Sequence, residues 1–402
     1  MINEKMYNLG SARSEIRELF EYGKKRKAEI GEENVYDFSL GNPSVPCPVA
    51  VGEAMSELLR THDPIDLHGY TSAQGDAATR KAIADSISNT HSFHVSADDL
   101  YLTVGAAAAL TSTLCAIATE GEEVILLAPY FPEYKVFVER AGATIRTVKC
   151  DPTTFAPDPK AIADVINEKT AAIIINSPNN PTGAVYSEES IKAIAHILKS
   201  RSEELGKSIY LIADEPYREL VYDSATVPFI PKFYNNTIVC YSYSKSLSLP
   251  GERIGYVLVS PMANEHTKVY AAVCGAGRSL GYVCAPSFLQ KVLPYCIGTT
   301  SDISIYAQNR QLLLTKLTEY GFETVKPEGA FYLFLKSPVG DGKAFSELAK
   351  KHEILLVPSD SFGYPGYVRI SYCVNTERIE SALGAFRKLA QELGLIGESN
   401  GK

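Results

Sequence analysis

Between residues 98 and 260, short apolar runs alternate with longer stretches that have helical spacing. The apolar runs are rich in β-branched side chains and predict short strands. They cover residues 100–104, 124–128, 144–149, 171–176, 209–213, 237–240 and 254–259. The runs at 171–176 and 209–213 are apolar throughout, which is typical of strands buried on both faces of a sheet. This alternation predicts an α/β fold with a mostly parallel central sheet.

The two ends of the chain follow a different pattern, with more helix and shorter strands. Helical spacing covers residues 12–30 and 49–60 before the alternation, and 302–320, 343–353 and 376–394 after it. Strand-like runs occupy residues 35–40, 329–334, 354–357 and 367–371. No internal repeat, low-complexity tract or long linker interrupts the chain.

Composition narrows the class of protein. The 402 residues are 45% hydrophobic and 21% charged, which is ordinary for a globular protein with a large core. The net charge of −8 argues against a nucleic-acid-binding surface. No window approaches the ~18 consecutive apolar residues of a membrane span, and the N-terminus lacks the apolar segment of a secretory signal. We therefore expect a cytoplasmic protein with no nucleic-acid or membrane partner.

The eight cysteines are scattered along the chain and form no Cys-x-x-Cys pair. Several of them, such as Cys240 and Cys284, lie within apolar runs. This distribution predicts reduced core cysteines rather than disulfides or zinc ligands, and we expect no metal site.

The stretch around Lys245 has the strongest chemical signal. It lies between the strand-like runs 237–240 and 254–259, and it carries alternating serines, one lysine and one arginine, Arg253. Because the stretch has few charges, we expect Lys245 to lie near apolar walls. A partly desolvated lysine loses its proton more readily and can attack a carbonyl group. Arg253 and the serines could hold a phosphate beside the resulting imine.

Two further polar positions follow apolar strands. Asn180 lies in a Pro-rich loop after the strand 171–176, and Asp214 ends the strand 209–213. Asp214 follows Asn180 by 34 residues and precedes Lys245 by 31, and each spacing fits one crossover unit of a parallel sheet. We therefore expect the three side chains to be neighbours at one edge of the sheet, where open α/β sheets bind ligands.

These segments resemble the motifs of the class I/II aminotransferases, which are pyridoxal 5'-phosphate (PLP) enzymes of fold type I. The matching motifs are Asn-Pro-Thr-Gly at 180–183, Asp-x-x-Tyr at 214–217, Ser-x-Ser-Lys at 242–245 and Arg-x-Gly at 253–255. One position departs from the family pattern, because Glu252 stands where an apolar residue is usual. The resemblance extends from about Gly41 to Arg369.

The resemblance implies a three-layer sandwich with a mostly parallel central sheet, plus a smaller α+β domain. The large PLP-binding domain would be residues 61–294. The N- and C-terminal segments, residues 1–60 and 295–402, would together form the small domain. It also implies a homodimer, in which Tyr70 reaches the cofactor phosphate of the neighbouring subunit.

The resemblance also assigns roles around the cofactor. Lys245 would form the Schiff base and then act as the base that moves the α-proton. Asp214 would keep the pyridine nitrogen protonated, which makes the ring an electron sink. The other cofactor contacts would be Asn180 and Tyr217 at the phenolic oxygen, Phe131 on the ring, and Gly105, Ala106, Ala107, Ser242, Ser244 and Arg253 at the phosphate. Tyr130 is a competing candidate for the ring contact.

The substrate would be an α-amino acid, whose amino group passes to a 2-oxo acid. Gly41 would line the substrate site with its backbone, Asn180 would contact the substrate, and Arg369 would bind the α-carboxylate as a planar fork. Arg278 is a weaker candidate for reading a second carboxylate.

Two other functions stay open from the sequence. A PLP-dependent lyase, such as a carbon–sulfur β-eliminase, would carry the same motifs on the same fold. A non-catalytic ligand-sensing module would need an N-terminal extension of some 60 residues, and the sequence has no such extension before these motifs.

Overall fold

The computed structural model describes residues 2–11 and 14–397. Its centre is a seven-stranded sheet with the strand order β2-β8-β7-β6-β5-β3-β4. The strands are β2 (Leu100–Thr103), β3 (Glu123–Ala128), β4 (Thr144–Lys149), β5 (Thr170–Asn176), β6 (Tyr210–Asp214), β7 (Thr237–Ser242) and β8 (Gly255–Val259). All neighbours pair in parallel except β8, which runs antiparallel to both β7 and β2. The predicted mostly parallel sheet is therefore confirmed.

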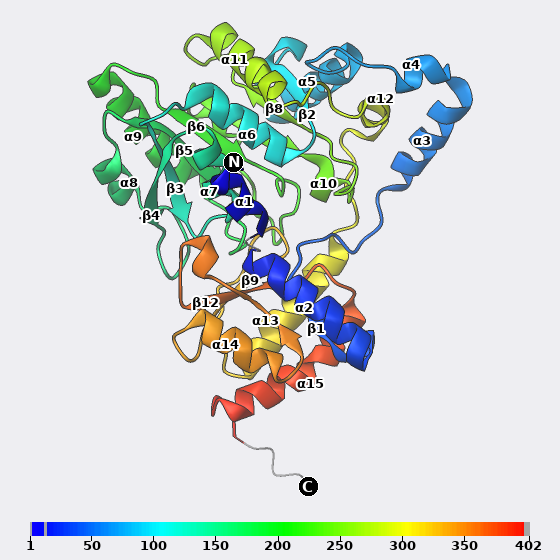
Figure 1. Cartoon of the computed structure of the whole chain (residues 1–402), viewed down its shortest axis with the longest axis vertical. Coiled ribbons are helices and arrows are strands. Elements are labelled where there is room, and N and C mark those ends of the chain that lie inside the picture. Colours follow the sequence, from blue (N-terminus) through cyan, green and yellow to red (C-terminus); the bar gives the residue numbers. More distant parts are fainter. Residues whose placement is uncertain (1, 12–13, 398–402) are drawn as a thin grey trace.

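Helices cover both faces of this sheet, which is the middle of three layers (Figure 1). One face packs against α5 (Ala77–His91), α8 (Pro159–Val165), α9 (Glu188–Leu205) and α12 (Ser287–Cys296). The other face packs against α6 (Ala106–Ile117), α7 (Glu133–Arg140) and α11 (His266–Ser279). Successive strand residues point to opposite faces, so Ile173 and Ile175 join the first core while Ala172 and Ile174 join the second.

The two ends of the chain meet in a second, smaller body with its own core (Figure 1). Its antiparallel sheet has the order β11-β12-β9, and β1 pairs in parallel with β10. The strands are β1 (Tyr36–Asp37), β9 (Tyr332–Lys336), β10 (Ile354–Leu355), β11 (Val357–Pro358) and β12 (Tyr367–Ser371). The helices are α2 (Glu15–Ile30), α13 (Ser304–Glu319), α14 (Gly342–Lys350) and α15 (Thr376–Glu392).

Three predicted strands of this body differ from the observed ones. The run 35–40 contributes only β1, and the run 354–357 is split at Leu356 between two different sheets. The run 329–334 begins late because the backbone N–H groups of Gly329 and Ala330 donate to carbonyls of Gly183 and Leu220 in the large body. Those contacts use the groups that a longer strand would need. The predicted helix 12–30 is α2, and residues 12–13 lie outside the described part of the chain.

Helix α3 (Val49–Thr61) packs away from the body to which the sequence assigned it. Its buried side chains, Val51, Ala54 and Leu58, belong to the core of the seven-stranded sheet, and the helix contacts α12. The predicted boundary after residue 60 therefore cuts the last turn of α3 and separates the helix from the core against which it packs. The apolar stripe of α3 predicts burial, but it does not say against which body.

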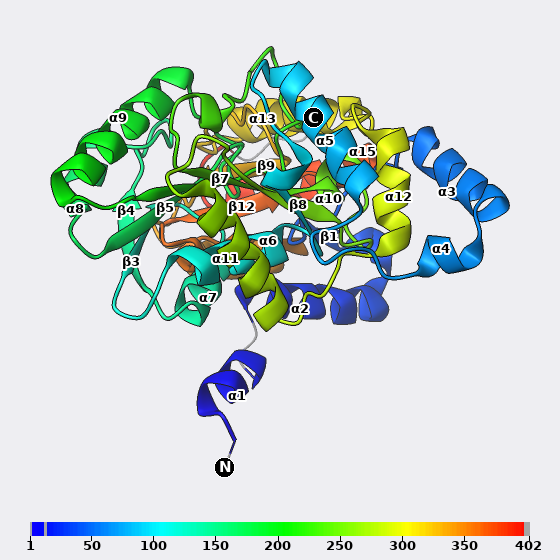
Figure 2. The ribbon, with the colours of Figure 1, turned by 90° about the horizontal axis from the view of Figure 1, so that it is seen from above.

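The remaining elements are short or peripheral. They are α1 (Glu4–Ser11), α4 (Pro64–His68), α10 (Tyr243–Ser246), and the 3₁₀ turns Glu32–Asn34, Ala97–Asp99, Ile230–Lys232 and Asp360–Phe362. Helix α1 projects from the rest of the molecule (Figure 2) and has no buried residue. Among the described residues, no helix is long and apolar enough to cross a membrane. In the same part of the chain, no cluster of three His, Cys, Asp or Glu side chains could hold a metal ion.

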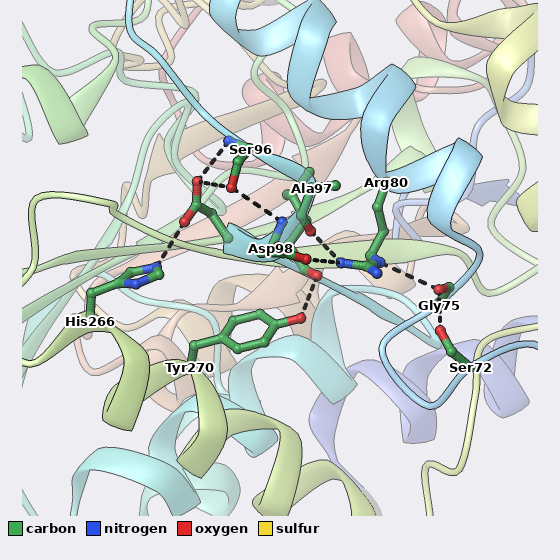
Figure 3. A network of polar contacts seen from close by, with 10 residues as sticks. Ser72, Gly75, Arg80, Ser96, Ala97, Asp98, His266 and Tyr270 are labelled. Atoms are coloured by element: carbon green, nitrogen blue, oxygen red, sulfur yellow. Dashed lines mark hydrogen bonds and ion pairs between the residues drawn. The ribbon is translucent and has the colours of Figure 1, made fainter.

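A polar network around Arg80 of α5 holds the loop that follows Tyr70 (Figure 3). Arg80 Nε donates to the carbonyl of Gly75 at 3.4 Å, and Ser72 Oγ donates to the same carbonyl at 2.5 Å. Gly75 has a φ of +107°, and a Cβ there would lie 2.5 Å from Leu102. Only glycine suits this close left-handed position, so the loop has a fixed path.

Candidate active site

A cavity of about 310 Å³ lies where the carboxyl ends of β5, β6 and β7 meet. These strands end in Asn176, Asp214 and Ser242, which all line the cavity. The other lining residues are Ile16, Gly41, Ala106, Ala107, Leu110, Phe131, Phe137, Asn180, Pro216, Tyr217, Ser244, Lys245, Pro250, Arg253, Tyr332 and Arg369. With the exception of Gly105, Tyr70 and the two weaker candidates Tyr130 and Arg278, every residue that the sequence proposed for the site is among them.

Lys245 lies in α10, a single helical turn directly after β7. The turn forms because the Ser242 hydroxyl accepts the N–H of Ser244 at 3.1 Å and so caps its first turn. The Lys245 ammonium donates to the carbonyl of Gly41 at 2.7 Å. Burial lowers the pKa of Lys245 to about 8, and the charges of Arg253 and Arg369 act in the same direction. The neutral amine that a nucleophile requires is therefore more populated near pH 7 than for an exposed lysine.

Asp214 is a buried carboxylate with one free oxygen. Its Oδ2 accepts a short hydrogen bond from the Tyr134 hydroxyl and a longer one, at 3.4 Å, from Asn176 Nδ2. Within the described part of the chain, Oδ1 is buried and has no partner. Burial raises the pKa of Asp214 to about 7, and the bond from Tyr134 opposes that rise. A cationic N–H donor beside Oδ1 would satisfy this atom and keep the carboxylate ionised.

The end of the cavity near α6 is built to receive an anion. The first amides of α6 have no side-chain cap, and the helix begins with the small residues Ala106 and Ala107. Arg253 donates to Ser244 Oγ at 3.4 Å and to the Pro250 carbonyl at 2.9 Å, and among the described residues it makes no salt bridge. Free helix amides and an arginine are the usual ligands of a phosphate.

Gly105 lies behind this anion site and explains why the α6 end is so close to Arg253. Its φ is +86°, and a Cβ at this position would lie 2.6 Å from a terminal nitrogen of Arg253. Glycine therefore allows the guanidinium to approach the start of the helix, although Gly105 itself does not line the cavity.

At the other end of the cavity, Arg369 of β12 reaches across from the small body. Its guanidinium donates to Asn180 Oδ1 at 3.0 Å and to the carbonyl of Ser39 at 2.6 Å. The side chain is only 2% exposed, and in the described chain its Nε has no partner. The rings of Tyr332 and Phe362 lie 4.5 Å and 5.3 Å from the guanidinium carbon. A buried guanidinium without a carboxylate partner calls for an anionic ligand.

Aromatic residues complete the walls. The Tyr217 hydroxyl lies 2.9 Å from that of Tyr332, and both rings line the cavity. Phe131 lines the cavity edge-on to Tyr134. Tyr130, the competing candidate for the ring contact, is buried in the core and does not line the cavity.

Tyr70 does not join the cavity of its own chain. Its side chain is 91% exposed at the start of the loop after α4. Arg278 lies near the end of α11, is exposed, and does not line the cavity either.

Sequence reasoning missed three residues that shape the site. Tyr134 and Asn176 contact Asp214, and Tyr332 pairs with Tyr217 and stacks on Arg369. Asn176 had a visible signal, because it is a polar residue at the end of an apolar strand, as Asp214 is. Tyr134 and Tyr332 had none, since a buried tyrosine near a strand or in a helix is usually a core residue.

Comparison with known proteins independently supports the family resemblance seen in the sequence. The family model described as aminotransferase class I and II matches residues 33–386. The aspartate aminotransferase of Thermotoga maritima is 30% identical over 373 residues, which cover 92% of this chain and 95% of that protein. The chain belongs to the class I and II aminotransferases.

Solved structures of related proteins match this aminotransferase over nearly its whole length. An amino transferase from Eubacterium rectale is 55% identical, with a TM-score of 0.96 and coverage of 98% of this chain and 99% of that one. The aspartate aminotransferase from Thermus thermophilus with maleate is 25% identical, with a TM-score of 0.84 and coverage of 97% and 99%. These matches confirm the predicted fold class.

The protein is thus an aminotransferase, which moves an amino group between an α-amino acid and a 2-oxo acid. The relatives favour this activity over the lyase alternative and over a non-catalytic sensing module. Class I and II aminotransferases depend on PLP.

Proposed function

We propose that this aminotransferase binds PLP in the cavity described above and holds it through Lys245. The observation that carries the proposal is the buried, unpartnered Oδ1 of Asp214, which shares one cavity with the low-pKa amine of Lys245. The two groups fit the two ends of one conjugated system, an aldehyde that needs an amine and a pyridine nitrogen that needs a carboxylate.

The residues of this chain divide the work of holding the cofactor. Arg253, Ser242, Ser244 and the amides of Gly105, Ala106 and Ala107 would bind the phosphate. Asp214 would keep the ring nitrogen protonated, with Tyr134 and Asn176 fixing the orientation of its carboxylate. Phe131 would cover one face of the ring, and Asn180 and Tyr217 would donate to the phenolic oxygen.

When bound, PLP supplies an electron sink that stabilises negative charge at the α-carbon of the substrate. Arg369 would bind the α-carboxylate and so fix which bond at the α-carbon faces the ring. Lys245, released from the cofactor by the substrate amine, would take the α-proton and return it elsewhere on the same face. Leu110, Phe131 and Phe137 give the cavity an apolar wall, which would limit water around the reacting atoms.

The substrate class that we propose is an α-amino acid with a free carboxylate. Two similar proteins are named aspartate aminotransferases, and one of their structures contains maleate. In the described chain, the cavity lining offers only Lys245, Arg253 and Arg369 as cations, and all three have roles in this proposal. A second carboxylate would need a cation from elsewhere, so the proposal does not include the substrate side chain.

Spectroscopy tests the proposal directly. The purified protein should be yellow and should lose that absorbance on borohydride reduction. The reduced cofactor should then remain covalently attached to Lys245 as a stable label. Mixing the PLP form with each amino acid in turn would show which of them convert it to the pyridoxamine form. A label on another lysine, or no label at all, would refute the proposed role of Lys245.

We also propose a cytoplasmic homodimer of two-domain subunits, in which α3 packs with the large domain rather than with the small one to which the sequence assigned it. Its support is the exposure of Tyr70, which has no place in its own cavity, together with the frequency of two-fold dimers. The free state of all eight cysteines fits a reducing compartment. Light scattering that finds a fully active monomer at assay concentration would contradict the dimer.

A further inference from the structure

A second cavity, of about 350 Å³, lies on the opposite side of β7 from the active site. Adjacent residues of this strand serve the two cavities, because Ser242 lines the first and Tyr241 the second. The same division continues into α10, where Lys245 faces the active site and Ser246 faces the second cavity. The cavity is therefore separate from the catalytic one but shares its supporting turn.

Glu219 is the unusual residue of this second cavity. Its Oε1 accepts a hydrogen bond from the Tyr241 hydroxyl at 2.9 Å, and that hydroxyl lies 2.9 Å from Ser246 Oγ. Its Oε2 is buried and, within residues 2–11 and 14–397, has no hydrogen-bond partner. Over the same residues Glu219 makes no salt bridge. A buried carboxylate oxygen with no partner is costly unless a ligand satisfies it.

The nearby basic groups do not supply that partner. Arg218 Nε and one terminal nitrogen pair with both oxygens of Glu215, at 2.6 Å and 2.5 Å, and the guanidinium also donates to the carbonyls of Val227 and Pro228. His91 stacks on Phe229, and burial lowers the pKa of His91 to about 4, so this ring is neutral near pH 7. Among the described residues that line this cavity, the carboxyl group of Glu219 is thus the one without a direct cationic partner. Burial raises the pKa of Glu219, and a cation beside Oε2 would keep the group ionised.

The rest of the wall suits an organic cation rather than a hydrated metal ion. The rings of Tyr241, Tyr243 and Tyr256 gather on one side, with centroid separations of 4.9 to 6.2 Å. Aromatic faces attract cations, most strongly when water is excluded. Ile83 and Val227 add apolar surface, and the volume lies in the range of small-molecule sites, about 300–1,000 Å³.

We propose that this second cavity binds a small organic ammonium ion, with its positive charge against Glu219 Oε2 and its alkyl part against the three tyrosine rings. The site is distinct from the one that holds the cofactor and substrate, and it does not depend on the proposed roles of the active-site residues. The ligand would enter past the exposed residues Thr299 and Thr300.

The probe should be tetramethylammonium, because a quaternary nitrogen cannot form a Schiff base with PLP. Its uncharged counterpart is tert-butanol, which has a similar size and shape. Calorimetric titration of the holoenzyme should give one tetramethylammonium site per chain, with tert-butanol at least tenfold weaker and potassium chloride without effect. Equal affinity for the two organic probes would overturn the proposal. So would the absence of tetramethylammonium binding up to 50 mM, a concentration on the order of ten times the largest dissociation constant expected of a specific site.

Two variants locate the site. Glu219→Gln keeps an acceptor for Tyr241 but removes the charge, so tetramethylammonium should bind at least tenfold more weakly. Thr300→Lys at the exposed mouth puts a cation of the chain itself near the cavity and should also weaken binding several-fold, without touching the core. Glu203→Gln on the surface of α9 is the control and should bind as the parent does.

Cofactor absorbance and far-ultraviolet circular dichroism check that each variant is folded. If Glu219→Gln does not fold, Thr300→Lys still decides the question. Binding that is unchanged in a folded Glu219→Gln, or unchanged in Thr300→Lys, refutes the site.

Discussion

The active site draws its residues from two regions that use secondary structure in different ways. The seven-stranded sheet provides Asp214 at the end of β6 and Lys245 in the turn after β7. The small antiparallel sheet instead provides Arg369 from the middle of β12 and Tyr332 from the start of β9. Strand ends of a parallel sheet meet at one edge by topology, whereas Arg369 reaches the cavity only because the small body packs over that edge.

The difference between the two regions indicates which part of the reaction each region would serve. In the proposed function, the groups at the large sheet would contact positions that every PLP reaction needs, the imine carbon and the ring nitrogen. The small body instead contributes the guanidinium of Arg369, which would recognise only the substrate carboxylate. Variants in the first region should therefore affect all substrates alike, and variants in the second should affect only substrates that carry a carboxylate.

Lys245→Ala should have the largest effect, because no other lysine among the described residues lines the cavity and could form the Schiff base. We expect turnover to fall to background for every amino acid, measured by 2-oxo acid formation. Lys199→Ala, on the surface of α9, should retain parental activity. Measurable turnover by Lys245→Ala would remove the central assignment of the large-sheet region.

Asp214→Asn should keep the fold and reduce kcat by about 10³-fold, since a neutral amide holds the ring proton poorly and weakens the electron sink. The loss should be the same for amino acids and for amines without a carboxylate. Stopped-flow half-reactions with both classes would measure it, with Asp164→Asn as the control. A loss confined to amino acids, or one of only a few-fold, would contradict the role.

Arg369→Lys tests the small-body region. It should lower kcat/KM for amino acids and oxo acids alike. The corresponding loss of transition-state stabilisation should be about 2–4 kcal/mol, the scale of a disrupted charge-assisted contact. PLP content should stay unchanged, and amines without a carboxylate should react as with the parent. Arg387→Lys on the exposed face of α15 is the matched control. An equal loss for amines and amino acids would erase the proposed division between the two regions.

Tyr134→Phe should have the smallest effect, because it removes one hydrogen bond and no charge. That bond favours the ionised form of Asp214, so its loss should raise the pKa of Asp214 further. PLP binding, which needs the ionised carboxylate, should therefore be lost at a higher pH than in the parent as the pH is lowered. The binding free energy of PLP should weaken by about 1.5–3 kcal/mol. Titration of the apoprotein with PLP from pH 6 to pH 9 would measure the shift. An unchanged pH profile would show that Tyr134 does not support Asp214.

Much of the large-sheet region was visible in the sequence for a local reason. An apolar run that stops at a polar residue predicts both a buried strand and the position of its end, and Asp214 is such a residue. The strand predicted at 237–240 instead continues to Ser242. The order and spacing of three strand ends then bring Asn180, Asp214 and Lys245 together, because parallel strands present the same end to the same edge.

By itself the sequence determined the α/β fold, the parallel sheet and the residue types at its edge. Only the tertiary structure decided which groups meet across long separations, such as Lys245 with the carbonyl of Gly41 and Arg369 with Asn180. Only the tertiary structure shows that Oδ1 of Asp214 and Oε2 of Glu219 have no partner in the described chain. The physical reason is that hydrophobic periodicity depends on neighbours along the chain, whereas the partner of a buried polar atom depends on how separate elements pack.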